Sequence, residues 1–269
     1  MLAGMRLYKP SSAFPTLTGL VAQWPAPACV KAFMSTRAGG ISPSPWDSLN
    51  LGDHVGDAPQ RVERNRALLQ EALGVRPVFL DQVHGTEVLA LTAASAQRLQ
   101  GDACITDMSG LACTIMVADC LPVLLCDPKG RWVAAAHAGW RGLAGGVLEA
   151  LVQAAEAHGT DPGDMLAWLG PCIGPAAFQV GSEVRQAFVE VDPACVICFV
   201  PDQQGKWLAD LPGLARRRLA RMGLHQVHGN DGRSEWCTVS SVSSFFSHRR
   251  DASVLGASGR MAALIWLER

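Results

Sequence analysis

The sequence has few charged residues and no long apolar run. Asp, Glu, Lys and Arg make up 17% of the 269 residues, which is low for a soluble protein and predicts that much of the chain is buried. The formal net charge is −1, so no basic field points to nucleic acid or to an anionic membrane. The longest apolar run, residues 111–118, has the length of a strand and is too short for a membrane helix. We therefore expect neither a nucleic-acid partner nor a membrane partner.

The sequence also shows no pattern typical of a secretory signal, a disulfide framework, internal repeats or low-complexity linkers. The start of the chain has no apolar stretch as long as that of a signal peptide. The nine cysteines are odd in number and widely spaced, which predicts reduced thiols in a cytoplasm. Because the chain is long and 49% of its residues are hydrophobic, it can form a large hydrophobic core. We expect a single catalytic domain over residues 1–269, with an irregular lead-in over residues 1–28.

Hydrophobic patterns predict strands in the middle of the chain and helices mainly after them. The expected strands are residues 29–34, 78–83, 87–91, 103–106, 112–118, 121–126, 131–137, 166–169 and 261–267. The first expected helix is capped by Asp57, has Pro59 in its first turn and ends at Gly74. The other expected helices are residues 143–158, 182–189 and 211–222. Because helices do not alternate strictly with strands, the pattern favours an α+β fold with mixed β-sheets sandwiched by helices.

His84, Cys120 and His137 form the most informative set of residues. They lie in the segments FLDQVHGTEV, IMVADCLPVLLCD and WVAAAHAGWRGLAGG, of which the second and third are apolar strands that end beside a turn. Two imidazoles and one thiolate are a three-ligand set for Zn²⁺, and a tetrahedral ion then keeps an open corner for water. The long spacings are unlike a zinc finger, so the site requires rigid elements that aim distant side chains into one pocket.

Each of these residues also has an ordinary structural interpretation. A single cysteine in an apolar strand usually belongs to the core, and a single histidine at a strand end is usually a hydrogen-bonded structural residue. The small residues after His137 favour the metal site, because they let backbone approach a ligand closely. The pattern alone leaves both interpretations open.

The ordered motifs along the chain resemble the laccase-domain family, also called the polyphenol-oxidase-like or peptidoglycan-editing-factor family. The match covers most of the chain, and many ordered blocks are more specific than any single one. The blocks are STRAGGIS, NLGDHVGD, the NR of ERNR, DQVHG, GDACITD, ADCLPVLL, HAGWRG, GPCIGP and FFSHRRD through SGRMAALIWL. The tail departs from the family pattern, because the link between its RRD and GR elements is longer than usual.

The resemblance implies a fold, a cofactor and a chemistry. It implies a layered α/β/β/α arrangement like that of the cytotoxic necrotizing factor catalytic domain, with Zn²⁺ on His84, Cys120 and His137. It also implies phosphorolysis of adenosine, inosine, guanosine and methylthioadenosine, together with hydrolytic deamination of adenosine. The partners would then be a small purine nucleoside and phosphate. The residues do not indicate an oligomeric state.

The implied chemistry suggests roles for five further residues. Asp119, beside Cys120, is a candidate proton-transfer group or support for the zinc ligands, and a strand-end cap is the equally weighted alternative. Arg37 is the first candidate for binding phosphate, because a guanidinium can contact two oxygens at once. Arg141 and Arg249 are weaker candidates for substrate binding, and Asn50 is a candidate for a ribose hydroxyl or for a turn cap.

The residues argue against one further function and leave three others open. Blue-copper and trinuclear copper chemistry is rejected, because the seven histidines contain no H-x-H pair, although adventitious Cu²⁺ binding stays open. The alternatives kept are a metal-free hydrolase with Cys120 as nucleophile and His137 as base, a binding module with structural zinc, and a peptidoglycan-precursor editing factor.

Overall fold

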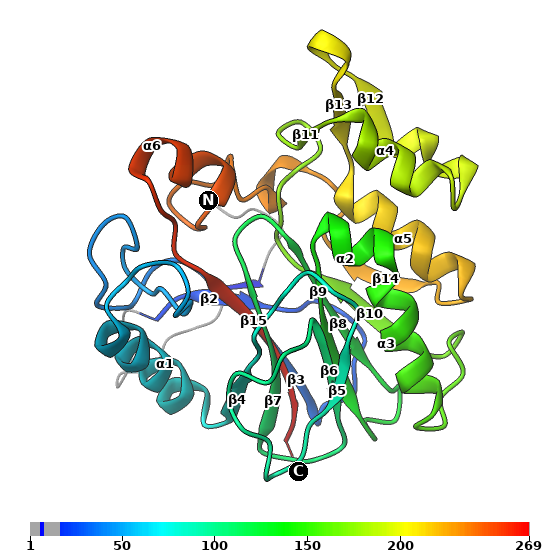
Figure 1. Cartoon of the computed structure of the whole chain (residues 1–269). Helices are drawn as coiled ribbons and strands as arrows, with labels where there is room; N and C mark the ends of the chain where they lie inside the picture. Colours follow the sequence, from blue (N-terminus) through cyan, green and yellow to red (C-terminus); the bar gives the residue numbers. More distant parts are fainter. Residues whose placement is uncertain (1–5, 8–16, 269) are drawn as a thin grey trace.

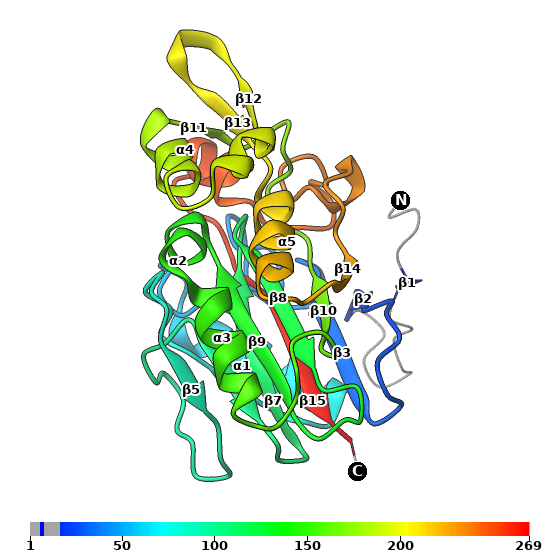
Figure 2. The ribbon, with the colours of Figure 1, turned by 90° about the vertical axis from the view of Figure 1, so that its right-hand side faces the viewer.

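Two six-stranded β-sheets pack face to face and carry helices on their outer faces (Figures 1 and 2). The structure is a computed structural model, and it describes residues 6–7 and 17–268. The strand order of the first sheet is β1-β2-β3-β15-β7-β4. Its strands are β1 (Arg6–Leu7), β2 (Gly19–Val21), β3 (Val30–Ser35), β15 (Met261–Leu267), β7 (Leu111–Val117) and β4 (Arg76–Phe79).

The second sheet has the order β14-β10-β8-β9-β6-β5. Its strands are β14 (Gln226–Gly229), β10 (Leu166–Leu169), β8 (Leu121–Cys126), β9 (Val133–Ala138), β6 (Ala103–Thr106) and β5 (Val88–Ala90). Both sheets are mixed. Strands β4 and β7 are parallel in the first sheet, as are β5 with β6 and β10 with β14 in the second, and the other neighbouring strands are antiparallel.

A smaller third sheet stands at one end of the molecule, where its hairpin projects beyond the two large sheets (Figure 2). It consists of β11 (Gln179–Val180), β13 (Trp207–Ala209) and β12 (Phe199–Pro201). The helices are α1 (Pro59–Leu73), α2 (Trp140–Gly145), α3 (Val147–Glu156), α4 (Ser182–Val189), α5 (Leu211–Arg221) and α6 (Ser253–Leu255). The described residues also form the short 3₁₀ helices η1 (Pro193–Cys198), η2 (Gln203–Gly205) and η3 (Ser234–Trp236) and the π-helix η4 (His248–Ala252).

The alternation of side chains along the buried strands divides the core into layers. In β9, Val133 and Ala135 pack between the two sheets, whereas Ala134 and Ala136 pack on the side of α3 and α5. In β15 the other sheet shows the same division, since Ile265 faces the space between the sheets and its neighbours face the α1 side. The result is an α/β/β/α sandwich, which confirms the α+β fold class.

Several boundaries differ from the sequence-based expectation. The helix expected over residues 143–158 is two helices, because Gly146 adopts a left-handed conformation with φ of 103° between α2 and α3. Asp57 does not provide the N-cap side-chain bond of α1; Ala58 is the cap residue, and Asp57 bonds instead to Ser42 and Asn50. The lead-in expected to be irregular contributes β1 and β2. Within the described ranges, no helix is long and apolar enough to cross a membrane.

A buried carboxylate fixes the hairpin between β8 and β9. Asp127 is fully buried and accepts hydrogen bonds from the backbone N–H groups of Lys129 and Arg131, from the Arg131 guanidinium and from the Thr160 hydroxyl. Burial acts to raise the pKa of Asp127, but these donors outweigh burial and hold that pKa well below its usual range. The ionised carboxylate therefore stabilises the fold.

We expect Asp127→Asn to lower the free energy of unfolding by about 1.5–3 kcal/mol at pH 7, the usual cost of losing hydrogen bonds to a charged group. Because the folded pKa lies below the unfolded value of about 3.9, this stabilisation is present above that value and is lost as the pH falls through the folded pKa. Urea unfolding at pH 7 and at acid pH should show the difference between the two proteins shrinking toward low pH. A constant difference would contradict the role of the charge.

Candidate metal centre and the pocket around it

Cys120 lies on the connection between the two sheets. Strand β7 belongs to the first sheet and β8 to the second, and only residues 118–120 separate them. His137 lies in β9, and its register partner in β8 is Pro122, so it stands close to this connection. His84 follows β4 in the loop before β5. The fold thus brings three distant segments to one end of the sandwich.

Asp102 holds both histidines in place. Its carboxylate is fully buried and accepts a hydrogen bond from His137 Nδ1 at 2.8 Å. It also accepts the consecutive backbone N–H groups of Val83, His84 and Gly85 at 3.1, 2.9 and 2.7 Å. Burial acts to raise the pKa of Asp102, but the bonds from His137 and the backbone hold that pKa below its usual value. Because Nδ1 of His137 is engaged, Nε2 is the nitrogen left to face a metal.

The backbone at His84 is in a left-handed conformation with φ of 62°. Such a conformation is uncommon for a residue with a side chain and needs support from its surroundings. Successive N–H groups converge on one anion when left-handed and right-handed residues alternate, and the carboxylate of Asp102 is that anion here. The same interaction that fixes the loop therefore also sets the direction of the His84 ring.

Gly139 leaves room for the three side chains. A Cβ atom at this position would lie 2.9 Å from His84 Cδ2 and 3.0 Å from Cys120 Sγ. These distances are shorter than ordinary van der Waals contacts, so any larger residue would displace a candidate ligand. The small residues after His137 thus allow the close approach that the sequence pattern predicts.

The three donor groups fit a single metal ion. One nitrogen or sulfur from each of His84, Cys120 and His137 lies within 4.8 Å of the others, and Cys120 Sγ is 3.8 Å from His84 Nε2. In a tetrahedral zinc site with nitrogen and sulfur ligands, the donor atoms lie about 3.3–3.8 Å from one another. The three donor atoms would therefore have to move together only slightly to bind zinc. Within residues 17–268 the group contains these three residues alone. Three protein ligands leave a coordination position open, as in a catalytic site.

The charges of the three groups also suit a cation. Burial acts to raise the pKa of the Cys120 thiol, but the His137 and His84 imidazoles outweigh it and bring that pKa to about 6. Burial acts to lower the pKa of His137, but Cys120 and Asp102 raise it to about 9. The thiolate that a metal requires is therefore the favoured form of Cys120 at neutral pH, and binding of a metal would release the His137 proton.

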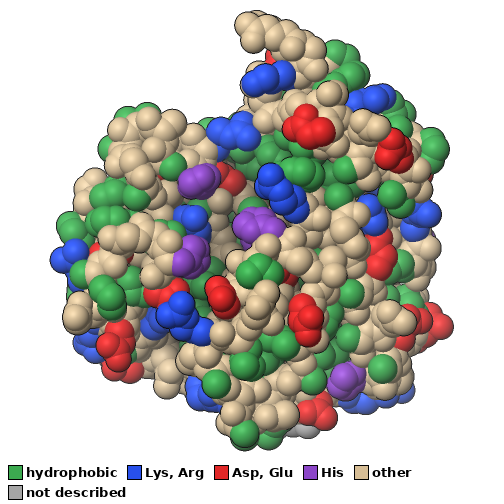
Figure 3. Space-filling model, in the orientation of Figure 1, with side chains coloured by type: hydrophobic (Ala, Val, Ile, Leu, Met, Phe, Trp, Pro, Cys, Tyr) green, Lys and Arg blue, Asp and Glu red, His purple; other side chains and the backbone are tan. Residues whose placement is uncertain are grey.

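A pocket of about 300 Å³ opens above the three side chains. Besides them, its charged or titratable lining consists of His54, Arg141, His248 and Arg260. Figure 3 shows this face of the molecule hollowed in the middle, with histidine and basic side chains around the hollow. Burial lowers the pKa of the Arg260 guanidinium, which donates hydrogen bonds to the carbonyls of Ser258 and Gly259. The lining is cationic, and no Asp or Glu belongs to it.

A second, smaller pocket of about 140 Å³ adjoins the first one at Cys120 and His248. Its wall is mainly apolar and is formed by Trp140, Ile173, Phe178 and Leu211, together with Ala118, Asp119 and Arg249. The linings of the two pockets share Ala118, Cys120 and His248, so one ligand of moderate size would contact both pockets.

The structure places two of the predicted substrate-binding residues outside these pockets. The Arg37 guanidinium binds the Asp47 carboxylate at 3.1 Å and the carbonyl of Val242 at 3.2 Å. Asn50 is fully buried, and its amide joins Gly52 to the backbone N–H of Arg260. Arg37 therefore fixes a surface loop in this state, and Asn50 supports Arg260 rather than facing the cavity.

Asp119 and Arg249 lie at the pocket, but their polar atoms already have partners. The two carboxylate oxygens of Asp119 accept hydrogen bonds from the Thr238 hydroxyl at 2.5 Å and the Arg249 backbone N–H at 2.6 Å. The Arg249 guanidinium donates to the carbonyl of Gln179. This arrangement favours a positioning role for Asp119, in which it holds the segment that carries His248 beside the triad. Its proton-transfer role stays a prediction.

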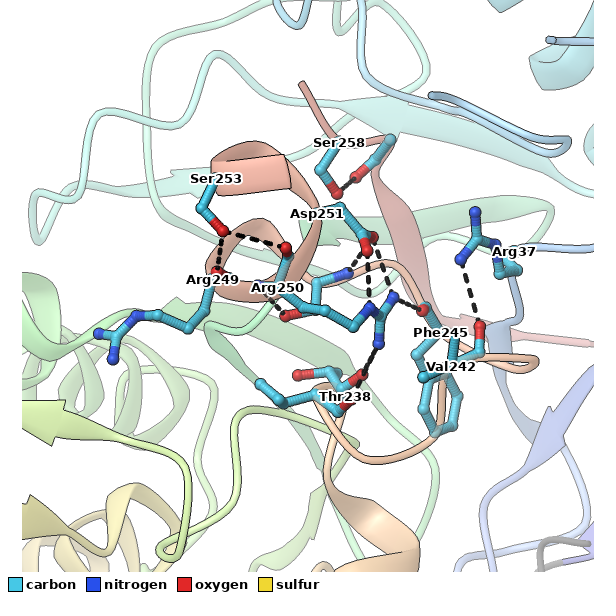
Figure 4. A network of polar contacts seen from close by, with 12 residues as sticks. Arg37, Thr238, Val242, Phe245, Arg249, Arg250, Asp251, Ser253 and Ser258 are labelled. Carbon is cyan, nitrogen blue, oxygen red and sulfur yellow. Dashed lines mark hydrogen bonds and ion pairs between the residues drawn. The ribbon is translucent and has the colours of Figure 1, made fainter. Parts of the chain in front are cut away.

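Arg250 organises that segment from inside (Figure 4). Its guanidinium donates to the carbonyls of Thr238, Val239 and Phe245 and forms an ion pair with Asp251 at 2.6 Å. Figure 4 shows Arg250 at the centre of this network and the Arg249 side chain directed away from it. The network gives His248 a defined place on η4.

Sequence reasoning missed the residues that support or complete the site. Asp102, His54, His248 and Arg260 all lie within motifs that the sequence singles out: GDACITD, NLGDHVGD, FFSHRRD and SGRMAALIWL. The available signal was the presence of a titratable residue in each of these motifs. The local sequence does not show which of these side chains point into the site.

A family model described as multi-copper polyphenol oxidoreductase laccase matches residues 31–268. The chain belongs to this family. The family description names copper, but a multicopper cluster needs several close histidine pairs. Among the described residues, the group suited to a metal contains two histidines and one cysteine.

Curated relatives and solved structures cover nearly the whole chain. It is 51% identical over 250 residues to the purine nucleoside phosphorylase PA4543 of Pseudomonas aeruginosa, covering 93% of this chain and 98% of the relative. It is 50% identical over 251 residues to the purine nucleoside phosphorylase YfiH of Escherichia coli, covering 92% and 98%. The crystal structure of Neisseria meningitidis NMB0706 superposes with a TM-score of 0.86 at 47% identity, covering 93% of this chain and 99% of that one.

We expect Gly139→Ala to weaken metal binding by about 10–100-fold, the usual effect of disturbing the immediate supports of metal ligands. The added methyl group would push against His84 and Cys120. Competition for Zn²⁺ with a chromophoric chelator measures the change.

The matched control is Gly145→Ala, at the last residue of α2, the helix that follows Gly139. A Cβ atom there would come no closer than 3.4 Å to its nearest neighbour, Thr86 Cγ2. This control should bind Zn²⁺ like the unchanged protein. Equal losses in the two variants would show that the close approach at Gly139 is not the cause.

Proposed function

We propose that this protein is a zinc-dependent purine nucleoside enzyme. Its reactions would be phosphorolysis of adenosine, inosine, guanosine and methylthioadenosine, and hydrolytic deamination of adenosine. The single observation that carries the proposal is the juxtaposition of the triad His84, Cys120 and His137 with a pocket lined by cationic groups and by no carboxylate. The names of the relatives, purine nucleoside phosphorylases, support the same substrate class.

The cationic lining suits phosphate. Arg260 is partly buried and, in the described part of the chain, its guanidinium donates only to the carbonyls of Ser258 and Gly259. Arg141 lines the same pocket, with its guanidinium 4.4 Å from the centre of the Trp140 ring. Among the described residues neither guanidinium has a carboxylate partner, and the partly buried charge of Arg260 in particular favours an anionic ligand that would stabilise it.

Phosphorolysis then follows from positioning. A phosphate oxygen held by Arg141 and Arg260 attacks C1′ of the ribose while the bond from C1′ to the purine nitrogen breaks. The purine leaves with the bonding electron pair and takes up a proton, and ribose 1-phosphate remains. The arginines hold the phosphate in line and prevent it from diffusing away during this step.

A zinc ion bound to the triad would supply Lewis-acid chemistry, which makes water acidic enough to attack an amino-substituted purine carbon in deamination. The protein's own contribution is to orient the ligands through Asp102 and to hold the substrate beside them. All nine cysteines are free thiols in the structure, which agrees with our proposal of a reducing cytoplasmic compartment.

The metal-free hydrolase remains the second candidate, because the Cys120 thiol and the His137 imidazole each shift the pKa of the other toward its charged form, as a nucleophile and its base do. That mechanism does not require His84. No group in the pocket points specifically to a peptidoglycan precursor.

We expect His84→Ala to abolish both zinc binding and nucleoside turnover while the fold survives, since His84 is exposed and contributes one of three ligands. Elemental analysis and chromatography of adenosine incubated with phosphate measure the two losses. His225→Ala, at an exposed histidine outside the pocket, is the control and should keep both. Activity of the His84 variant without zinc, blocked by iodoacetamide, would instead support the Cys120–His137 hydrolase.

We expect Arg260→Gln to raise KM for phosphate by about 10–100-fold, the loss of a charge-assisted contact, with a smaller effect on deamination. Initial rates with varied phosphate measure the change. Arg37→Gln tests the earlier candidate for the same role. If Arg37→Gln raises that KM and Arg260→Gln does not, phosphate binds outside the pocket.

A further inference from the structure

We infer that the apolar pocket beside Cys120 is the purine-base subsite and that Trp140 is its principal recognition residue. This inference rests on the proposed function and adds to it the orientation of the substrate. The base would occupy the apolar pocket, and the ribose and phosphate would occupy the cationic pocket. The bond to be cleaved then lies near Cys120 and His248, which line both pockets.

The open surface of the apolar pocket suits a flat aromatic group. Trp140, Ile173, Phe178 and Leu211 form its wall, and Trp140 is partly exposed there. Aromatic and aliphatic walls bind planar rings by stacking and by excluding water. Such a wall offers no hydrogen-bond partners to ribose hydroxyls.

The charged groups of this pocket do not alter that conclusion. Both carboxylate oxygens of Asp119 accept hydrogen bonds from Thr238 and Arg249, and the Arg249 guanidinium donates to Gln179. These groups are occupied within the protein. The Arg249 guanidinium also lies 5.8 Å from the centre of the Phe178 ring, so it covers part of the aromatic wall.

Two consecutive residues at the start of α2 separate the pockets. Trp140 lines the apolar pocket, whereas Arg141 lines the cationic one and stacks at 4.4 Å over the Trp140 ring. A nucleoside with phosphate has the same division, because its base is flat and largely apolar and its other end is polar and anionic. The reverse orientation would place an anion against an apolar wall and leave two guanidinium groups unpaired.

The experiment measures the binding of free adenine and of inorganic phosphate, each alone, to the zinc-loaded protein by calorimetry. Trp140→Leu should weaken adenine binding about tenfold or more, the usual scale of a lost base-stacking contact, and leave phosphate binding unchanged. Arg260→Gln should show the opposite pattern. If Trp140→Leu proves unstable, Phe178→Leu replaces it as the test, because Phe178 lines the same pocket and its loss should also weaken adenine binding.

A matched control comes from the third sheet. Trp207 carries the Arg185 guanidinium 4.4 Å from its ring, the same stacking as at Trp140, but it lies outside both pockets. Trp207→Leu should bind both ligands like the unchanged protein. Thermal unfolding of each variant separates a lost contact from a damaged fold.

The possible results have separate meanings. Adenine bound equally by Trp140→Leu and the unchanged protein, or not bound at all by an unchanged protein that cleaves adenosine, would overturn the inference. A Trp140→Leu variant impaired with methylthioadenosine but not with adenosine would overturn it too, because the pocket would then hold the 5′ substituent. An unchanged protein that cleaves no nucleoside in the presence of phosphate would refute the proposed function itself.

Discussion

The buried carboxylate of Asp102 is the interaction on which the site depends. It accepts four hydrogen bonds, three from the consecutive N–H groups of residues 83–85 and one from His137. Those bonds sustain the left-handed backbone of His84 and select the free nitrogen of His137. A neutral or shorter side chain could not satisfy these donors in a buried position. One carboxylate thus orients two of the three candidate ligands before any metal arrives.

The third ligand depends on the crossing between the sheets. The chain passes from β7 to β8 through residues 118–120, so Cys120 stands where the two halves of the sandwich meet. Asp119 beside it bonds to Thr238 and to the backbone of Arg249, and Arg250 ties the same distant segment together. The elements that carry the triad and the elements that cover it are therefore one connected framework.

The site is divided by charge. One pocket at Cys120 is lined by Arg141, Arg260 and His54, the adjoining pocket has an apolar wall that includes Trp140, and His248 lines both. This division matches a substrate with an apolar end and an anionic end better than it matches a small symmetric ligand. The donor set suits one Lewis-acidic ion, and the lining of the larger pocket suits an anion.

The sequence by itself determined the elements with strong patterns. Strands Leu166–Leu169 and Met261–Leu267 and helix Ser182–Val189 agree with expectation because their apolar periods and bounding turn residues are local properties. The three candidate ligands were also recognisable from their side-chain chemistry. Only the tertiary structure decided that Asp102 supports the two histidines among them, that Arg260 lines the pocket and that Arg37 does not. Those facts depend on which way a side chain turns and on which distant segment meets it, and no local pattern contains that information.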